Sequence, residues 1–248
     1  MKLQDQVALI TGGVSGIGRE TAVLLAKEGA HVVLNYSKSE AEAKDAVAAI
    51  EALGRKAMPY RADVSNDARV SAMVEEVAKT FGRLDILVNS AGATTMVPFK
   101  NLEGLTEEAW DRMYAVNVKG VFFCSRAAAR VMLPQGSGCI VNVSSMAGLM
   151  ATGSSIAYAA TKAAAISLTK TMALTLAPNI RVNCVAPSMV NTPWNVSRPE
   201  ALPKVAEKTP LNRFAEAYDV AEVILSLVTS AGFVTGQTIA IDGGLYLA

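Results

Sequence analysis

Three side chains in the second half of the chain could together move a proton to or from a substrate oxygen. Tyr158 and Lys162 stand four positions apart, which on a helix places the phenol and the ammonium one turn apart on one face. A free tyrosine has a pKa of about 10, and a neighbouring cation favours the phenolate, so we expect Lys162 to lower the pKa of Tyr158. Taken alone, this pair also fits a solvated helix face. Chemistry is favoured because Ser145, thirteen residues upstream, ends a strand-like run and could donate to the same oxygen.

Other catalytic groups are scarce in this chain. His31 is the only histidine, which excludes Ser-His-Asp hydrolysis and a multi-histidine metal site. We expect His31 simply to stand at the entry of a strand. Cys124, Cys139 and Cys184 are far apart and lie among apolar residues, which is typical of buried thiols. No metal site is predicted.

A glycine-rich turn lies near the start of the chain. Residues 11–18 read Thr-Gly-Gly-Val-Ser-Gly-Ile-Gly and follow the apolar run 7–11 directly. Gly12 permits a tight turn, Gly16 lets backbone approach a pyrophosphate, and Gly18 allows close packing of helix on strand. The helix that follows offers N–H donors and a partial positive charge at its first turn. The sequence therefore predicts dinucleotide binding, with a purely structural turn as the alternative.

The spacing of apolar residues predicts a single-domain α/β protein over residues 1–248, with parallel βαβ units. The strands are expected at residues 7–11, 31–36, 56–61, 84–89, 139–144, 180–186 and 237–241. A long alanine-rich helix is predicted over about 155–177, and Ser65 is the expected cap of a helix that runs to Phe81.

Prolines gather after the sixth predicted strand, at Pro187, Pro193, Pro199, Pro203 and Pro210. We expect this stretch to lack regular structure. In an open α/β sheet the loops beyond the carboxyl ends of the strands surround the ligand. The sequence therefore predicts a lid-like segment at about 188–215.

Composition limits the kind of partner. Hydrophobic residues make up 51% and charged residues 18%, which predicts a large core and is consistent with an additional interface between subunits. The formal net charge of +1 offers no basic field for nucleic acid. The sequence holds no run long enough to span a membrane and no secretory signal at its start. We therefore expect a cytoplasmic protein that binds neither nucleic acid nor membrane.

Taken together, these motifs resemble the short-chain dehydrogenase/reductase family over essentially the whole chain. Further matches are Asp63, Val64, Asn89, Ala91, Gly92, Asn117, Asn183, Pro187 and Thr192. The resemblance implies a doubly wound, Rossmann-like fold with a seven-stranded parallel sheet and helices on both faces. It also implies hydride transfer between a nicotinamide and a carbonyl or alcohol carbon, in a homotetramer or homodimer. Ser90 and Ser188 depart from the usual alanine and glycine, but neither change removes a catalytic group.

The resemblance also implies roles for individual residues. Tyr158 would be the acid in reduction and the base in oxidation, and Lys162 would lower its pKa and hold the nicotinamide ribose. Ser145 would orient the substrate oxygen, since its offset from Tyr158 fits the family better than that of Ser144. Asn117 would maintain a water-linked proton path to the lysine. The expected cofactor-binding residues are Thr11, Gly12, Ser15, Gly16, Ile17, Gly18, Tyr36, Ser37, Lys38, Asp63, Val64, Asn89, Ala91, Gly92, Tyr158, Lys162, Pro187 and Thr192. Among them, Asp63 and Val64 would flank the adenine, Asn89 the adenosine side, and Thr192 the carboxamide.

The end of the second strand bears on the choice of nicotinamide. Enzymes of this architecture that use NAD place an acid near position 36, where this chain has Tyr36. Ser37 and Lys38 then offer a hydroxyl and a cation to a 2′-phosphate, although Lys38 could also be an ordinary solvated lysine. We therefore predict NADP(H) in preference to NAD.

Methionines dominate the residues expected near the substrate. The pocket candidates are Thr94, Thr95, Met96, Met146, Leu149, Met150, Met189, Val190 and Trp194. This lining predicts a medium-sized apolar or aromatic carbonyl compound. The alternative is a 3-oxoacyl-carrier-protein reductase, but the stretches 133–139 and 176–179 lack the basic residues that would receive an acidic carrier. A more remote alternative is a nucleotide-binding scaffold without activity, although such relatives usually lose the tyrosine or lysine that is intact here.

Overall fold

Seven parallel strands form the central sheet of the computed structural model, which describes residues 1–195 and 201–247. In spatial order these are β3 (Ala57–Arg61), β2 (His31–Tyr36), β1 (Val7–Thr11), β4 (Ile86–Asn89), β5 (Gly138–Val143), β6 (Ile180–Pro187) and β9 (Thr238–Ile241). All seven predicted strands are present within a few residues, and the seven-stranded parallel sheet is confirmed. The order reverses between β1 and β4, which opens a crevice at the carboxyl ends of these strands.

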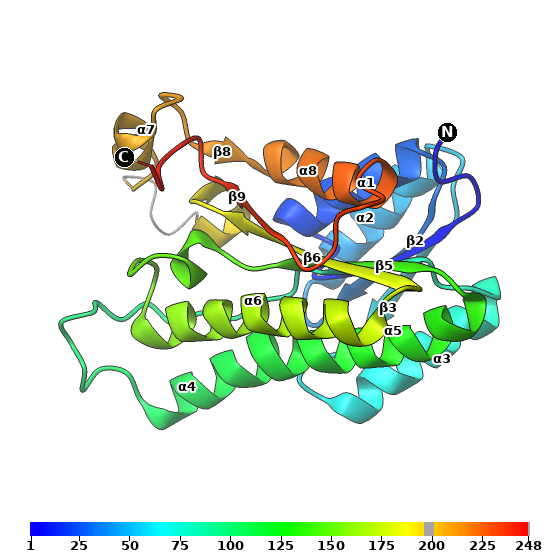
Figure 1. Cartoon of the computed structure of the whole chain (residues 1–248), viewed down its shortest axis with the longest axis horizontal. Helices are drawn as coiled ribbons and strands as arrows, with labels where there is room; N and C mark the ends of the chain where they lie inside the picture. Colours follow the sequence, from blue (N-terminus) through cyan, green and yellow to red (C-terminus); the bar gives the residue numbers. More distant parts are fainter. Residues whose placement is uncertain (196–200, 248) are drawn as a thin grey trace.

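Helices cover both faces of the sheet (Figure 1). One face carries α1 (Gly16–Lys27), α2 (Glu40–Glu51) and α8 (Ala217–Thr229). The other carries α3 (Asp67–Phe81), α4 (Glu107–Tyr114), α5 (Val121–Gln135) and α6 (Ile156–Leu176), with the π-helical segment η1 (Ala115–Gly120) joining α4 to α5. None of the helices in the described part of the chain is long and apolar enough to cross a membrane.

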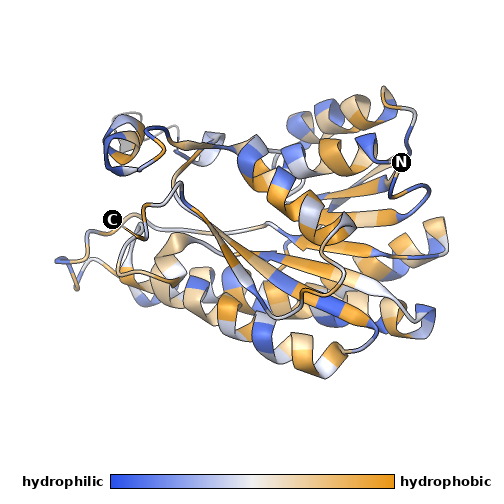
Figure 2. Cartoon of the chain, turned by 45° about the horizontal axis from the view of Figure 1, so that its top comes forward, coloured by the Kyte–Doolittle hydropathy of each residue, from blue (hydrophilic) through white to orange (hydrophobic). Residues whose placement is uncertain are grey.

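The two faces explain why the strands are apolar at every position. In β1, Ala8 and Ile10 pack into the core under α1, α2 and α8, whereas Val7 and Leu9 pack into the core on the opposite face. A strand buried on both sides reads as a continuous apolar run rather than an alternating one. Figure 2 shows this hydrophobic colouring concentrated on the strands between the helix layers.

Helix α6 brings the candidate catalytic residues into position. Its cap is Ser155, whose hydroxyl accepts a hydrogen bond from the Tyr158 backbone N–H at 3.2 Å. The helix ends at Leu176 because Ala177 precedes Pro178 and is extended, as a residue before proline prefers to be. The predicted span of about 155–177 is therefore confirmed.

The cap predicted for α3 is wrong. Asn66 is the cap, and its side chain accepts the Arg69 backbone N–H at 3.1 Å. Ser65 instead bonds to Asp63, with its hydroxyl 2.8 Å from Asp63 Oδ1. Serine and asparagine are both good caps, so sequence alone could not decide between neighbouring positions.

The proline-rich stretch has more regular structure than predicted. It contains β7 (Val190–Asn191), the 3₁₀ turn η3 (Pro193–Asn195), α7 (Ala201–Lys208) and β8 (Ala215–Glu216), and β7 pairs with β8. Pro193 and Pro203 lie in the first turn of η3 and of α7, where a missing N–H costs no hydrogen bond. The expectation of an irregular segment is therefore wrong here, while Pro199 lies outside the described residues.

The histidine and the cysteines have the structural roles that were predicted. His31 begins β2, and its Nδ1 accepts the Lys56 backbone N–H at 3.1 Å. Cys124, Cys139 and Cys184 are buried free thiols, and burial raises the pKa of each. None of these groups is available for the chemistry of the site.

Candidate active site

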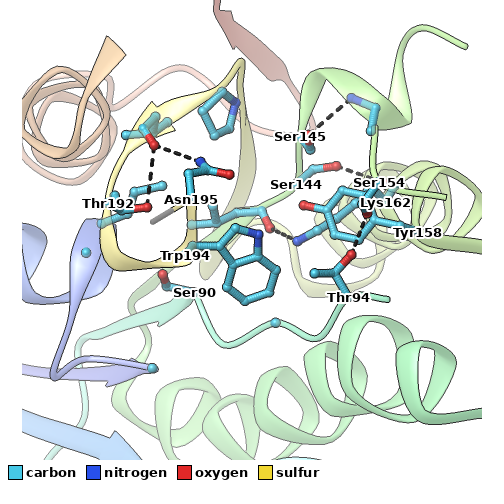
Figure 3. Close-up of a pocket in the computed structure, with 18 of the residues that line it drawn as sticks. Ser90, Thr94, Ser144, Ser145, Ser154, Tyr158, Lys162, Thr192, Trp194 and Asn195 are labelled. Carbon is cyan, nitrogen blue, oxygen red and sulfur yellow. Dashed lines mark hydrogen bonds between the residues drawn. The ribbon is translucent and has the colours of Figure 1, made fainter. Parts of the chain in front are cut away.

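A cavity of about 790 Å³ lies at the carboxyl edge of the sheet (Figure 3). It begins at the glycine-rich turn after β1 and extends past the ends of β2 and β3 to the loops that follow β4, β5 and β6. Residues 187–190 and 192–195 line it from the side of β7 and η3. The crevice predicted from the topology is thus a real pocket, large enough for an extended ligand.

The glycine turn is shaped to approach a ligand with its backbone. Gly12 and Gly16 have φ values of +62° and +50°, a backbone region that residues other than glycine rarely adopt. A Cβ atom on Gly12 would lie 3.1 Å from the Ala91 backbone, and one on Gly16 would lie 3.3 Å from Thr192. Ser15, the N-cap of α1, makes no side-chain capping bond, and the first turn of α1 holds no acid. The first N–H groups of α1 therefore remain able to bind an anion, which fits the pyrophosphate of a dinucleotide.

Two residues of the turn, Gly18 and Thr11, have structural roles and do not face the ligand cavity. A Cβ atom on Gly18 would lie 2.3 Å from the Gly12 carbonyl oxygen, so only glycine allows the packing of helix on turn. The buried Thr11 hydroxyl accepts the backbone N–H groups of Ser90 and Ala91, each at 3.1 Å. Neither Gly18 nor Thr11 lines the cavity. Gly18 lets α1 pack on the turn, and Thr11 ties the turn to the loop after β4.

Ser145, Tyr158 and Lys162 meet on one wall of the cavity (Figure 3). Ser145 follows β5, and its Oγ accepts the Ala147 backbone N–H at 3.1 Å. The Lys162 ammonium lies 5.6 Å from the centre of the Tyr158 ring and donates to the Val143 carbonyl oxygen at 2.8 Å. These contacts hold the three functional groups toward one volume of space.

The neighbouring serine has a different role. The Ser144 hydroxyl is buried and donates to the Lys162 carbonyl oxygen at 2.8 Å. Its hydrogen is therefore engaged in holding α6 against the end of β5. This geometry supports the choice of Ser145 over Ser144 as the group that faces a substrate.

The pKa values of the pair differ from the sequence-based expectation. Burial raises the pKa of Tyr158 to about 12, against a smaller opposing effect from a hydrogen bond with Ser145. Burial likewise lowers the pKa of Lys162 to about 8. The net lowering of the Tyr158 pKa that the sequence predicted is not found here, because burial of the phenol is the largest influence on that pKa and Lys162 Nζ is directed to the Val143 carbonyl oxygen. At neutral pH Tyr158 is therefore a protonated phenol.

Asn117 lies behind the cavity wall that Ser145, Tyr158 and Lys162 form. It is buried in η1, where its Oδ1 accepts the Ala93 backbone N–H at 2.8 Å. Its Nδ2 donates to the Ala93 carbonyl oxygen at 2.9 Å and to Thr161 Oγ1 at 3.0 Å. The side chain does not line the cavity, so by contact it positions the loop after β4 against α6.

Most of the predicted nucleotide-binding residues do line the cavity. They are Gly12, Ser15, Gly16, Ile17, Tyr36, Ser37, Asp63, Val64, Ala91, Gly92, Tyr158, Lys162, Pro187 and Thr192. Lys38 and Asn89 do not. The Asn89 amide is buried and donates to Ser125 Oγ and Asn142 Oδ1, each at 2.9 Å, so it braces β4 instead of facing a nucleotide.

Asp63 is held by a residue that the sequence analysis did not identify. Arg112, on α4, donates to Asp63 Oδ2 at 2.8 Å and also lines the cavity. Burial alone would raise the pKa of Asp63, but hydrogen bonds from the Ser65 backbone and side chain and from Arg112 keep that pKa below its ordinary value. The carboxylate is therefore ionised and fixed in direction.

The predicted substrate end is lined largely as expected. Its lining includes Thr94, Met96, Met146, Met150, Met189, Val190 and Trp194, whereas Thr95 and Leu149 lie outside. Trp194 is 49% exposed, and a Cβ atom on Gly92 would lie 3.5 Å from its indole ring. The Thr94 hydroxyl is hydrogen-bonded to the Ser154 hydroxyl, which ties together two loops of the pocket.

Several lining residues carried no recognisable signal in the sequence. They are Asn35, Ala62, Arg112, Val116, Thr152, Gly153, Ser154, Asn195, Val205, Lys208 and Leu245. They come from segments far apart along the chain, and only the folded arrangement brings them to one cavity.

Known proteins resemble this chain over its whole length. The family model described as Enoyl-(Acyl carrier protein) reductase matches residues 12–246. The 3-oxoacyl-[acyl-carrier-protein] reductase FabG of Thermotoga maritima is 41% identical over 250 residues, covering 100% of both chains.

Solved structures agree with these sequence relatives. A short chain dehydrogenase from Burkholderia cenocepacia J2315, in complex with NADP, superposes with a TM-score of 0.93 at 37% identity and covers 99% of this chain and 100% of its own. An NAD⁺-bound xylitol dehydrogenase superposes with a TM-score of 0.91 at 30% identity, covering 98% and 100%. Because the match extends to the full fold and to most of the sequence, the chain belongs to the short-chain dehydrogenase/reductase family, oxidoreductases that act on carbonyl and alcohol groups.

Proposed function

We propose that this protein is an NADPH-dependent reductase of carbonyl compounds that also catalyses the reverse oxidation of secondary alcohols. The observation that carries the proposal is the convergence of Ser145, Tyr158 and Lys162 on a cavity that continues to the glycine turn. A proton donor and a dinucleotide-binding backbone then share one volume. When bound, the nicotinamide supplies or accepts the hydride.

The turn and the strand ends would hold the cofactor. Gly12, Ser15, Gly16 and Ile17 would bind the pyrophosphate, because they surround the free N–H groups at the start of α1. At the adenosine, Tyr36, Ser37, Asp63 and Val64 would contact ribose and adenine, and Ala91 and Gly92 would lie beside them. At the nicotinamide, Pro187 and Thr192 would contact the carboxamide, and Lys162 the ribose.

The preference for NADP(H) over NAD is supported by the end of β2. Tyr36 stands where an acid would repel a 2′-phosphate, and Ser37 beside it lines the cavity. Solved relatives include both an NADP complex and an NAD⁺ complex, so the family alone does not decide between the two. The residues of this chain favour NADP(H).

The pKa values and contacts of Ser145, Tyr158 and Lys162 indicate how a proton would reach the substrate oxygen. Ser145 Oγ would donate to the substrate oxygen and stabilise the charge that develops on it. Tyr158, kept protonated by burial, would then donate its proton to that oxygen. The Lys162 ammonium would stabilise the phenolate that remains, since it already lies 5.6 Å from the ring centre. Asn117 would hold the loop after β4 in register with α6 during the reaction.

The lining favours an apolar or aromatic carbonyl compound as substrate. Met96, Met146, Met150 and Met189 offer adaptable apolar surface, and Trp194 adds an aromatic face. A second candidate, reduction of a 3-oxoacyl group on a carrier protein, is favoured by the name of the Thermotoga maritima relative. The absence of basic residues in the stretches 133–139 and 176–179 argues against such a carrier here.

NADPH consumption with matched substrates tests the proposal. We expect turnover of a small aryl ketone at a higher kcat/KM than that of an acetoacetyl thioester, carried on an acyl carrier protein or on a small thiol. A higher kcat/KM for the carrier-bound thioester would favour the second candidate. Binding of NADPH without turnover of any ketone or aldehyde in a broad panel would instead indicate a nucleotide-binding scaffold.

A further inference from the structure

Arg61 is an exposed arginine at the end of β3, one strand away from the predicted ribose site. Its Nε donates to the Ser37 carbonyl oxygen at 3.2 Å. In the sheet register Arg61 pairs with Tyr36, and the next backbone N–H, that of Ala62, donates to the Tyr36 carbonyl oxygen at 2.9 Å. The guanidinium is therefore anchored beside the Tyr36–Ser37 corner of the cavity.

The backbone on which Arg61 stands is firmly held. Asn35 is buried at the end of β2, and its Nδ2 donates to the Ala62 carbonyl oxygen at 3.0 Å and to the Tyr60 carbonyl oxygen at 3.3 Å. These bonds cross from β2 to β3 on both sides of Arg61. The backbone of Arg61 is thus fixed by the sheet, and the 3.2 Å bond from Nε to the Ser37 carbonyl oxygen directs the side chain from that backbone.

In residues 1–195 and 201–247 no carboxylate forms an ion pair with Arg61. The nearby Asp63 is already engaged by Arg112 and Ser65, and Glu40 pairs with Lys44 at 3.7 Å. Since the anchoring bond uses only Nε, the two terminal nitrogens keep their N–H groups for another acceptor.

We propose that Arg61 binds the 2′-phosphate of NADP(H) and, together with the Ser37 hydroxyl, determines the preference over NAD(H); this inference rests on the proposed cofactor. A guanidinium presents a planar pair of N–H donors that matches two oxygens of a phosphate. The 2′-phosphate bound at this corner would be the anionic partner of the Arg61 guanidinium. Neither Arg61 nor Lys38 lines the cavity itself, but the Arg61 guanidinium is hydrogen-bonded to Ser37, which does, so Arg61 rather than Lys38 is held at this corner.

Direct binding measurements test this inference without using catalysis. The dissociation constants of NADPH and NADH are measured by cofactor fluorescence for the natural protein, Arg61→Ala, Arg61→Lys and the control Arg130→Ala, an exposed arginine on α5. We expect Arg61→Ala to weaken NADPH binding about tenfold or more and to leave NADH binding unchanged, since the lost contact is a charge-assisted hydrogen bond. Arg61→Lys should fall between, because one ammonium cannot both hold Ser37 and present a planar pair of donors.

A fragment of the cofactor separates a phosphate contact from a change of fold. Adenosine 2′,5′-bisphosphate and adenosine 5′-monophosphate are titrated calorimetrically, and only the bisphosphate should lose affinity in Arg61→Ala. Equal weakening with both ligands, or no weakening with either, overturns the inference. If the natural protein itself binds NADH as tightly as NADPH, the proposed cofactor preference is wrong, and the inference fails with it. If the natural protein prefers NADPH and the variants keep that preference, only the role of Arg61 is wrong.

Discussion

The two ends of the cavity are built in different ways. The nucleotide end uses backbone groups from one short stretch, residues 12–17, and the carboxyl ends of adjacent strands. The substrate end uses side chains, largely methionine and tryptophan, from separate segments near Met96, Met146 and Met189. Backbone N–H groups at a helix start recognise phosphate whatever side chains surround them, whereas flexible apolar side chains accept many shapes. The first end therefore leaves a recognisable motif in the sequence and the second does not.

The largest effect is expected from a substitution of Tyr158, which lies where the two ends of the cavity meet. Tyr158→Phe removes the proton donor, so kcat for carbonyl reduction should fall about 10²–10⁴-fold. NADPH binding, measured by cofactor fluorescence, should not change, because the nucleotide end is untouched. Turnover that survives the substitution would contradict the assignment of Tyr158 as the acid.

The pH dependence of reduction should be set by Lys162. Its pKa of about 8 means that the ammonium is present below that pH and is lost as the pH rises through it. Tyr158, with a pKa of about 12, stays protonated over the same range. The kcat/KM for NADPH, which reports groups of the free enzyme, should therefore fall about tenfold for each pH unit above the pKa of Lys162. In Lys162→Arg the charge persists at all these pH values, so the fall should disappear even if the activity is lower.

A substitution at Gly12 tests whether the nucleotide is bound by the backbone of the glycine-rich turn. An alanine there would have its Cβ 3.1 Å from the Ala91 backbone at a φ of +62°, which costs about 1–2 kcal/mol before any clash. We expect NADPH to bind about tenfold more weakly in Gly12→Ala. Gly54→Ala is the matched control, since Gly54 has a φ of +73° with nothing within 4 Å of the added atom. The control should lose a similar amount of stability in thermal melts and bind NADPH normally.

The smallest effect is expected from a substitution at the substrate end, because its flexible apolar side chains can adapt to the change. Trp194→Ala removes an aromatic face that is 49% exposed, so KM for an aryl ketone should rise only several-fold, with kcat nearly unchanged. A matched aliphatic ketone should show a smaller change. A large loss of kcat with both ketones would mean that Trp194 positions the reacting groups rather than the substrate body.

Some details of the site were outside the reach of the sequence. The motif at 11–18 predicted cofactor contacts for Thr11, yet its hydroxyl braces the loop after β4. Asn89 and Asn117 are likewise committed to buried hydrogen bonds, and Thr95 is not among the residues that line the cavity. A motif identifies a residue that the fold requires, but it does not distinguish contact with a ligand from support of the residue beside it.

The sequence by itself determined the sheet, the glycine turn and the spacing of Ser145, Tyr158 and Lys162. These features depend on local properties: apolar runs for buried strands, positive φ at Gly12 and Gly16, and one helical turn between Tyr158 and Lys162. Only the tertiary structure decided the partners of Lys162, Arg112 and Arg61, and the raised pKa of Tyr158. Long side chains select their partners from distant segments, and a pKa depends on the water that packing removes, so neither can be read from spacing along the chain.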